Sequence, residues 1–244
     1  MSNLVRVTYF RGRGVAETTR WMLAAGGVAF ESVALSLPEE FEALKKEGML
    51  PFNQLPLLEI DGLRISQSLA MVQYVGRRCS FYGDGSFSAA ELARLDMIQG
   101  AVKDLAGPVM GRSFNPDQAV AIQAMVTALA KFGPRLEAMV SPATGLFELG
   151  REPADAPPSG GQAALAQFTI ADILTAEALH SYREVQTASP DLFPTDIDSE
   201  YPALTRLYKT VTAHPPLRAY LDSDQHWPMP GDAYVANVRT VLNR

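Results

Sequence analysis

The stretch that decides the fold is FNQLPLLEIDGLRISQS, residues 52–68. Within it, apolar runs at residues 57–60 and 63–65 flank an Asp-Gly pair. Asp-Gly between two apolar runs is the strongest short-range signal for a β-hairpin. Because proline cannot donate a hydrogen bond within a sheet, Pro56 must stand at the start of the first strand. We therefore expect a hairpin that begins directly after Leu55-Pro56.

The residues before this hairpin predict a strand, a helix and a second strand. Leu4–Phe10 is rich in β-branched residues and has an aromatic end. The turn RGRG at residues 11–14 leads to a predicted helix at Val15–Ala25, which Gly26-Gly27 ends. Val28–Leu35 is the second strand candidate. This order predicts a parallel pair of strands with a crossover helix.

Two further helices complete the first eighty residues. Pro38–Lys46 is charged and predicts a short surface helix that ends at Gly48. Ser68 is a suitable N-cap for a helix that runs to about Arg78. The resulting order is β-α-β, a connecting helix and β-β-α, and Ser80–Phe87 then forms a linker.

Beyond the linker, apolar residues recur every three or four positions, as an amphipathic helix requires. Ser88 with Glu91, and Thr169 with Asp172, predict two helix starts with capping boxes. The pattern therefore predicts an all-helical second half, and the chain divides near residue 80.

Another helix start is predicted at residues 115–118, with Asn115 as the cap, Pro116 at the first helical position and Gln118 at the box position. Gly133-Pro134 is expected to kink or divide this helix. Pro142–Gln162 predicts a long surface loop, and further helices are expected at Tyr201–Ala213, Pro216–Leu221 and Asp232–Leu242.

Composition and charge limit the classes of function. The chain has 244 residues, is 47% hydrophobic and carries a formal net charge of −6, which argues against a nucleic-acid partner. Its one cysteine, Cys79, cannot form an intrachain disulfide or a Cys-rich metal site, and its three histidines lack metal-ligand spacing. No signal peptide or membrane-spanning stretch is recognisable. We expect a cytoplasmic protein with no metal and no membrane partner.

Three local features before residue 80 suit a binding site, and each also has a purely structural explanation. Tyr9 ends a strand at a Gly-rich turn, where functional side chains are common, although position alone favours a half-buried strand aromatic. Leu55-Pro56 is the type of bond that is readily found cis, although a trans turn proline fits too. Gln67-Ser68 begins a helix whose free N–H groups suit a carboxylate, or is an ordinary cap.

Taken together and in this order, these features resemble cytosolic glutathione transferases, and the resemblance runs nearly end to end. YFRGRGVAE at residues 9–17 looks like the first strand and helix of the tyrosine-type classes, and RWMLAAGGV at residues 20–28 is most like the alpha and sigma classes. Residues 52–62 and 67–68 resemble the glutathione-binding core. The second half adds TIAD at residues 169–172, YPAL at residues 201–204 and a tail similar to the alpha-class C-terminal lid helix.

The resemblance implies the fold and its division. An α/β thioredoxin-like domain at residues 1–80 would bind glutathione, and an all-α domain at residues 88–244 would supply the electrophile pocket and the lid helix. Pro56 would be cis, which would turn the Leu55 backbone toward the cysteinyl part of glutathione in a strand-like pairing.

The resemblance also implies a mechanism centred on Tyr9. A thiolate attacks electrophiles far better than a thiol, and an ordinary thiol with a pKa of ~8.5 is mostly protonated at neutral pH. A donor that hydrogen-bonds to the thiolate lowers the pKa of the thiol. The Tyr9 hydroxyl, with a pKa near ~10, would be that donor and would itself stay neutral.

The other charges of glutathione match further residues by resemblance. Lys45 would pair with the glycyl carboxylate, Gln54 would contact the peptide, and Gln67 with Ser68 would hold the γ-glutamyl carboxylate. Asp104 would reach across a homodimer to the glutamyl amino group. From the residues alone, Lys45 is also explained as a solvated charge, and Asp104 as an exposed helix carboxylate.

An apolar pocket for the electrophile is expected between the two domains, with one departure from the family pattern near the sulfur. The departure is Val15, which stands where alpha-class and many sigma-class members have a second arginine, so that a cation is missing unless Arg11 or Arg13 replaces it. Met110 and Phe114 are equally explained by core packing. The expected lining comprises Phe10, Gly14, Met110, Phe114 and Tyr234.

Two classes of function therefore remain open. The leading hypothesis is a glutathione transferase acting on apolar electrophiles, with a glutathione-dependent isomerase or peroxidase as a variant. The competing class is a non-enzymatic ligand carrier or crystallin-like structural protein. A cysteine-based redox activity requires a cysteine near the first helix, and Cys79 lies at the far end of the domain.

Overall fold

Two parallel strands form the centre of the first half. In the computed structural model, which describes residues 4–83, 85–149 and 168–244, strand β1 (Val5–Phe10) pairs in parallel with β2 (Phe30–Leu35). The connection runs through a short 3-10 turn, η1 (Gly14–Ala16), and helix α1 (Glu17–Ala25). The predicted crossover is therefore confirmed, although the α-helix begins two residues after Val15 because the 3-10 turn comes first.

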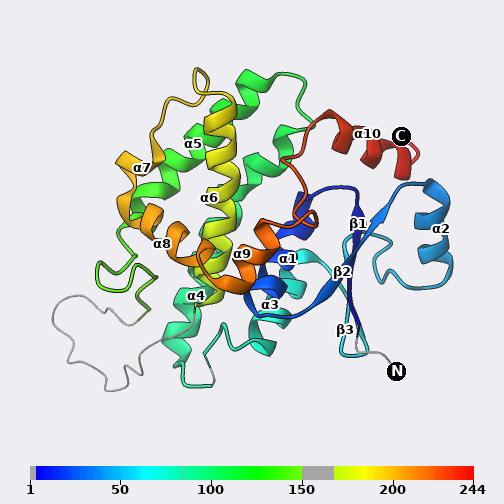
Figure 1. The fold of residues 1–244 in the computed structure, drawn as a ribbon, viewed down its shortest axis with the longest axis horizontal. Helices are drawn as coiled ribbons and strands as arrows, with labels where there is room; N and C mark the ends of the chain where they lie inside the picture. The colour runs from blue at the N-terminus through cyan, green and yellow to red at the C-terminus, as the bar shows by residue number, and fades with distance from the viewer. Residues whose placement is uncertain (1–3, 84, 150–167) are drawn as a thin grey trace.

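The predicted hairpin completes the sheet. Strands β3 (Leu57–Ile60) and β4 (Leu63–Ser66) pair antiparallel, and β3 also pairs antiparallel with β1, which gives the order β2-β1-β3-β4 shown in Figure 1. Asp61 and Gly62 both have positive φ, 51° and 78°, as the tight turns that join hairpin strands require.

Helices lie on both sides of this sheet. Figure 1 shows α2 (Pro38–Lys46) on the side away from the helical half, whereas α1 and α3 (Ser68–Arg78) face that half. The prediction that Ser68 caps α3 is wrong by one residue. Gln67 occupies the cap position, with φ of 71°, and no side chain caps this helix.

The second half is helical throughout the part that the structure describes. The capping boxes Ser88–Glu91 and Thr169–Asp172 are both confirmed. Residues 150–162 of the predicted surface loop lie outside the described ranges. The helices are α4 (Ala89–Arg112), α5 (Gln118–Glu137), α6 (Ile170–Ala188), α7 (Ile197–Glu200), α8 (Pro202–Thr212), α9 (Pro215–Leu221) and α10 (Asp232–Val241).

Helix α5 differs from its prediction at both ends. Its N-cap is Asp117, whose carboxylate accepts the first free N–H groups of the helix, and not Asn115. Pro134 lies inside the helix and does not divide it, since the ladder resumes where the Ala138 N–H donates to the Pro134 carbonyl. Gly133 has a packing role, because a Cβ there would lie 2.7 Å from the Tyr201 ring.

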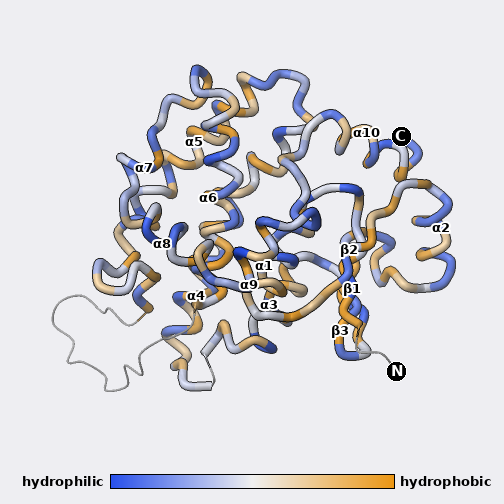
Figure 2. The backbone as a smooth tube through the Cα atoms, viewed as in Figure 1, coloured by the Kyte–Doolittle hydropathy of each residue, from blue (hydrophilic) through white to orange (hydrophobic). Residues whose placement is uncertain are grey.

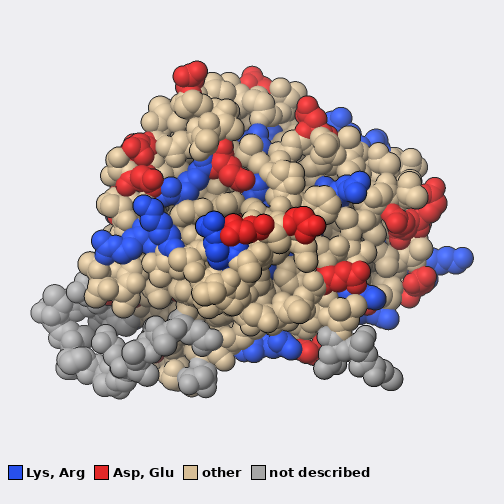
Figure 3. Space-filling view, viewed as in Figure 1, with Lys and Arg blue, Asp and Glu red and all other residues tan. Residues whose placement is uncertain are grey.

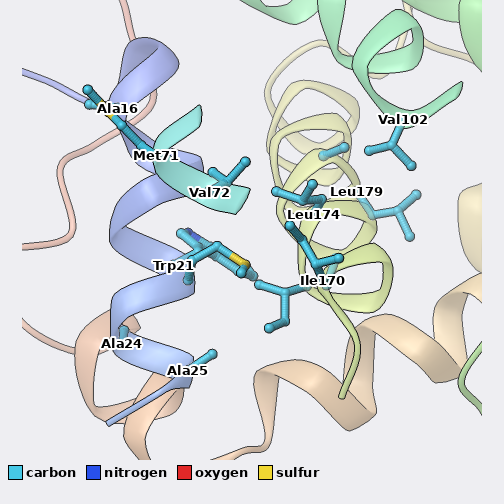
Figure 4. Packing of buried hydrophobic residues seen from close by; sticks show 14 of the residues in the cluster. Ala16, Trp21, Ala24, Ala25, Met71, Val72, Val102, Ile170, Leu174 and Leu179 are labelled. Carbon is cyan, nitrogen blue, oxygen red and sulfur yellow. The ribbon is translucent and has the colours of Figure 1, made fainter. Parts of the chain in front are cut away.

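The two halves share one continuous core. Figure 4 shows Trp21 of α1 and Val72 of α3 directed toward Ile170 and Leu174 of α6. Trp21 and Ile170 are fully buried, and α1 packs against α3, α6 and α9. Figure 2 shows apolar residues alternating with hydrophilic ones along the strands. The interface between the halves therefore has the apolar packing of a domain interior.

The molecular surface is of mixed charge. On the face shown in Figure 3, Lys and Arg side chains are interspersed with Asp and Glu. Within the described ranges, every helix is too short or too polar to cross a bilayer.

Candidate active site

Tyr9 lies at the carboxyl end of β1, where the central strand gives way to the Gly-rich turn. Its side chain is 5% exposed, and its hydroxyl lies 3.2 Å from the hydroxyl of Tyr234 on α10, a contact in which either group can donate. Burial raises the pKa of the Tyr9 hydroxyl above its usual 10.0, and the Tyr234 hydroxyl and the Val15 backbone offset only part of that rise. Tyr9 therefore stays neutral, and able to donate, at physiological pH.

Two glycines of the turn allow the tyrosines to meet. A Cβ on Gly12 would lie 2.5 Å from the Tyr234 ring, and one on Gly14 would lie 2.4 Å from the Tyr234 hydroxyl and 2.7 Å from the Tyr9 hydroxyl. Gly14 also has a φ of +45°, a conformation that glycine adopts without the cost other residues incur. The RGRG turn thus makes room for both phenol groups.

A buried ion pair supports the same turn from behind. Arg20, which is 1% exposed, donates to the Gly12 carbonyl at 2.9 Å and pairs with the Glu17 carboxylate at 3.1 Å. Glu17 in turn accepts hydrogen bonds from Trp21 at 3.1 Å and Tyr220 at 2.9 Å. The Arg20 charge also lowers the pKa of Tyr9, although by less than burial raises it. Arg20 is thus a cation whose charge favours the ionised form of Tyr9.

Neither Arg11 nor Arg13 supplies the cation that is missing at Val15. The Arg13 guanidinium is directed into the helical half, where it pairs with Glu184 at 2.7 Å. The Arg11 guanidinium lies over the Trp227 ring, 5.9 Å from its centroid. The positive charge that lowers the pKa of Tyr9 comes instead from Arg20, three residues after Glu17 on α1.

A second group of predicted residues gathers at the start of α3. The Leu55-Pro56 bond is cis, as the resemblance implied. The Gln67 side chain donates to the Gln54 side chain at 3.0 Å, and both residues are exposed. Because no side chain caps α3, the N–H groups of its first turn, including that of Ser68, remain available to an anion.

Helix α10 lies across the open end of the sheet. Figure 1 shows it beside α2 and the end of β1, and it packs against both. Asn237 fastens it there, because its side chain accepts from the Arg11 N–H at 2.7 Å and donates to the Leu35 carbonyl at 3.0 Å. Tyr234 consequently occupies the space beside Tyr9.

Two hollows in the molecular surface lie away from Tyr9. They measure about 400 and 480 Å³ and are on the helical half, and neither is lined by Tyr9 or Tyr234. The first lies beside His180, Glu184 and Tyr208, and the second beside Arg206 and Lys209. Among the described residues, no group of three or more His, Cys, Asp or Glu side chains is arranged to hold a metal ion.

Comparison with known proteins identifies the family. The family model for the N-terminal domain of glutathione S-transferase matches residues 5–77, and the model for the C-terminal domain matches residues 115–224. Rat glutathione S-transferase alpha-4 is 31% identical over 241 residues, which cover 97% of each chain. The chain belongs to the glutathione S-transferase family.

Further relatives agree with this transferase assignment. Chicken glutathione S-transferase 3 is 30% identical over 96% of this chain and 93% of its own. A solved glutathione S-transferase of Ascaris lumbricoides is 25% identical, with a TM-score of 0.66 over 93% of this chain and 98% of its own. A hookworm transferase, described as monomeric Na-GST-3 of Necator americanus, is 24% identical, with a TM-score of 0.68 over 91% and 97%, and supports the fold.

The remaining predicted residues of this transferase lie at varied distances from Tyr9. Phe10 is buried and packs edge-on against Tyr9, with ring centroids 4.9 Å apart. Phe114 is 43% exposed and packs against Tyr234 at 5.9 Å. Met110, four residues earlier, is half-buried on α4. The structure therefore brings Gly14, Phe114 and Tyr234 together, but Tyr234 fills the space between them where an open pocket was expected.

Two charged residues of the predicted site point to solvent or to their own helix. Lys45 on α2 pairs with Glu42 and lies over the Phe41 ring, 4.7 Å from its centroid. Asp104 is exposed on α4. Neither contacts Tyr9.

Sequence reasoning missed Glu17, Arg20 and Asn237. Glu17 and Arg20 are three residues apart on α1, a spacing that places two opposite charges side by side on a helix. That spacing was the available signal, although it does not distinguish a buried pair from an exposed one. No local signal marks Asn237, since its partners lie more than 200 residues away.

Proposed function

We propose that this transferase joins the thiolate of glutathione to apolar electrophiles, and that the hydroxyl of Tyr9 stabilises the thiolate. The observation that supports the role of Tyr9 is its placement: a buried, neutral hydroxyl at the end of the central strand, beside the Gly-rich turn. In such a site a hydrogen bond to a charged acceptor stabilises it by about 1.5–3 kcal/mol.

The reaction proceeds in two steps. The glutathione thiol releases its proton to solvent, and Tyr9 donates a hydrogen bond to the resulting thiolate without giving up its own proton. The sulfur lone pair then forms a bond to an electrophilic carbon. In a substitution the leaving group departs with the electron pair of the broken bond, and in an addition the new carbanion takes a proton from water.

Glutathione is placed by contacts to the first half. The cis bond at Leu55-Pro56 turns the Leu55 backbone toward the cysteinyl segment. Gln67 and Ser68, at the uncapped start of α3, receive the γ-glutamyl carboxylate. Gln54, whose side chain accepts a hydrogen bond from Gln67, contacts the peptide. Lys45 swings from Glu42 to the glycyl carboxylate.

The electrophile binds on the opposite side of the sulfur, against Phe10, Gly14, Met110, Phe114 and Tyr234. Aromatic and Met side chains suit an adaptable apolar pocket. Tyr234 lies beside Tyr9 on α10, which Asn237 fastens, so the electrophile binds against the Tyr234 ring.

A homodimer completes the proposed site, with Asp104 of each chain reaching the glutamyl amino group held by the other. Large apolar side chains remain exposed and offer surface for a second copy, among them Phe52 at 63% and Met97 at 55%. Sedimentation analysis tests this, because a chain that sediments only at the mass of one copy would overturn it.

We also assign residues 1–80 and 88–244 as the two domains and place the protein in the cytoplasm as an alpha-like, tyrosine-type member with a detoxifying role. The sheet ends at Ser66 and α4 begins at Ala89, which supports the division. The alpha names of the relatives support the class. Expression of either segment alone, cell fractionation and a Tyr9 variant test these assignments.

Substitution of Tyr9 by Phe tests the proposed function. Conjugation of glutathione to a chloroaromatic should fall roughly 10- to 100-fold, because one hydrogen bond to a charged sulfur is lost. The pKa of the bound thiol, followed by its ultraviolet absorbance, should rise by about one to two units. Glutathione affinity measured by calorimetry should change little, since the peptide contacts remain.

The outcome also separates the competing functions. Full activity of Tyr9→Phe would overturn the role of Tyr9. A wild-type chain that binds glutathione but converts no haloaromatic, enone, peroxide or isomerisable ketone would instead be a ligand carrier.

A further inference from the structure

The Tyr9 oxygen lies within hydrogen-bonding distance of a second phenol hydroxyl. A phenol oxygen accepts two hydrogen bonds and donates one. The Tyr234 hydroxyl lies 3.2 Å from the Tyr9 oxygen and can donate to it. When Tyr234 donates, the hydrogen of Tyr9 itself is left for another partner.

The position of Tyr234 is defined on several sides. Its side chain is 9% exposed, its ring lies against Gly12, and Phe114 packs edge-on against it at 5.9 Å. Three residues later, Asn237 binds the Arg11 N–H and the Leu35 carbonyl at 2.7 and 3.0 Å. Before the helix, Arg112 and Ser113 both donate to the Pro230 carbonyl at 2.8 Å. Contacts before and after Tyr234 in the chain thus hold its side chain in place.

From this geometry we infer that Tyr234 is a positioning residue: its hydroxyl donates to the Tyr9 oxygen and thereby aims and polarises the Tyr9 O–H toward the glutathione sulfur. The inference rests on the proposed role of Tyr9. Hydrogen bonds in a chain strengthen one another, and more so in a buried site of low dielectric. No proton is transferred between the tyrosines, so both remain neutral.

Val15 stands where a cation would otherwise favour the thiolate, and the relay takes over that role. Burial raises the pKa of both tyrosine hydroxyls, so neither becomes a competing anion next to the thiolate. Arg20 supplies positive charge from behind the turn, but its guanidinium is bonded to the Gly12 carbonyl and to Glu17. The contact with the Tyr234 hydroxyl is therefore what strengthens the hydrogen bond that Tyr9 donates.

The test is titration of the bound glutathione thiol in the full chain, using wild type, Tyr234→Phe, Tyr9→Phe and the double variant. Phe keeps the ring that packs on Gly12 and Phe114 and removes the hydroxyl alone. In Tyr234→Phe the thiol pKa should rise by about 0.5 to 1 unit, which is a roughly 3- to 10-fold decrease in the acid dissociation constant of the thiol. Glutathione affinity should stay within about twofold, since the change removes no peptide contact.

The double variant distinguishes a relay from a direct contact. If Tyr234 acts only through Tyr9, the double variant should have the thiol pKa of Tyr9→Phe alone. Tyr82→Phe is the matched control, because it also removes a buried hydroxyl, one bonded to Gln99 at 3.2 Å away from the site, and should leave the thiol pKa unchanged.

Four results would overturn the inference, and they are distinguishable. An unchanged thiol pKa in Tyr234→Phe, with a raised one in Tyr9→Phe, would reject the relay and leave the proposed function standing. Additive shifts in the double variant, or tighter glutathione binding by Tyr234→Phe, would mean that Tyr234 touches or competes with the sulfur. An unchanged pKa in Tyr9→Phe would reject the proposed function together with the relay.

Discussion

Gly14 lies under both phenol groups and has no room for a side chain. Substitution by Ala would place a methyl group 2.4 Å from the Tyr234 hydroxyl and 2.6 Å from the Tyr9 ring, at a φ of +45°. We expect the Gly14→Ala chain to lose roughly 1–3 kcal/mol of unfolding free energy and most of its conjugating activity. Urea unfolding and steady-state kinetics measure the two effects.

Gly107→Ala is the matched control. Gly107 lies inside α4 with no atom within 4 Å of its missing Cβ, so the same substitution should stabilise the chain by about 0.5–1 kcal/mol. If Gly14→Ala unfolds and reacts like Gly107→Ala, the two tyrosines are not packed as closely as described.

At this scale the residues alone were informative only where the signal is local. They placed Pro56 at a strand start and Gln67-Ser68 at a helix start, whereas the cis bond at Pro56 was predicted from the family resemblance. Glu17 and Asn237 were not recognisable, because burial and partners more than 200 residues away decide what they do.

At the scale of the element, the capping box of α6 connects three segments. The Asp172 carboxylate is fully buried and accepts from the Thr169 N–H, the Thr169 hydroxyl and the Phe147 N–H, at 2.8, 2.6 and 2.9 Å. Burial raises the pKa of this carboxyl, and the hydrogen bonds oppose the rise. The box therefore ties the start of α6 to the segment after α5 as well as capping the helix.

We expect Asp172→Ala to cost about 2–4 kcal/mol, because it removes a cap and leaves buried N–H groups without partners. Glu91→Ala in the exposed capping box of α4 is the comparison and should cost about 1 kcal/mol or less. Urea denaturation of both variants gives the difference. Equal losses would show that the contact with Phe147 contributes nothing.

Helix starts were predictable when their signal was a side chain that bonds a nearby N–H, as at Ser88 and Thr169. Other details were wrong. Gln67 and Asp117 took the cap positions expected for Ser68 and Asn115. Helix α5 was not divided at Pro134, and Gly133 beside it packs against Tyr201. Such competition between neighbouring caps and packing partners is not visible in local patterns.

At the scale of the whole molecule, ionisable groups are buried between the two halves. Burial, aided by the nearby Glu17 carboxylate, raises the pKa of Glu177 from 4.5 to about 8. Burial lowers the pKa of His180 from 6.5 to about 4. Both groups are therefore neutral in the folded chain near pH 7, so Glu177 keeps a proton that the unfolded chain has released.

This arrangement predicts a loss of stability in mild alkali. Between pH 4.5 and about 8 the folded chain holds the Glu177 proton more tightly, so stability falls by about 1.4 kcal/mol per unit as the pH rises. From about pH 4 to 6.5 His180 has the opposite effect, since there the unfolded chain binds the extra proton. The net fall should therefore appear between pH 6.5 and 8, by roughly 2 kcal/mol.

Glu177→Gln should flatten this fall. Thermal melts of wild type and variant across pH 6 to 8.5 measure it, and the variant should be the more stable at the alkaline end. Parallel curves for the two chains would show that Glu177 releases its proton at an ordinary pH.

The core that joins the halves also has an optical consequence. Only two tryptophans are present in the sequence: Trp21 lies fully buried between α1 and α6, and Trp227 lies in the segment before α10 with the Arg11 guanidinium over its ring. Their emission therefore reports on two separate events. Trp21 fluorescence follows separation of the halves, while in a Trp21→Phe chain the remaining signal reports on Trp227 and the segment before α10.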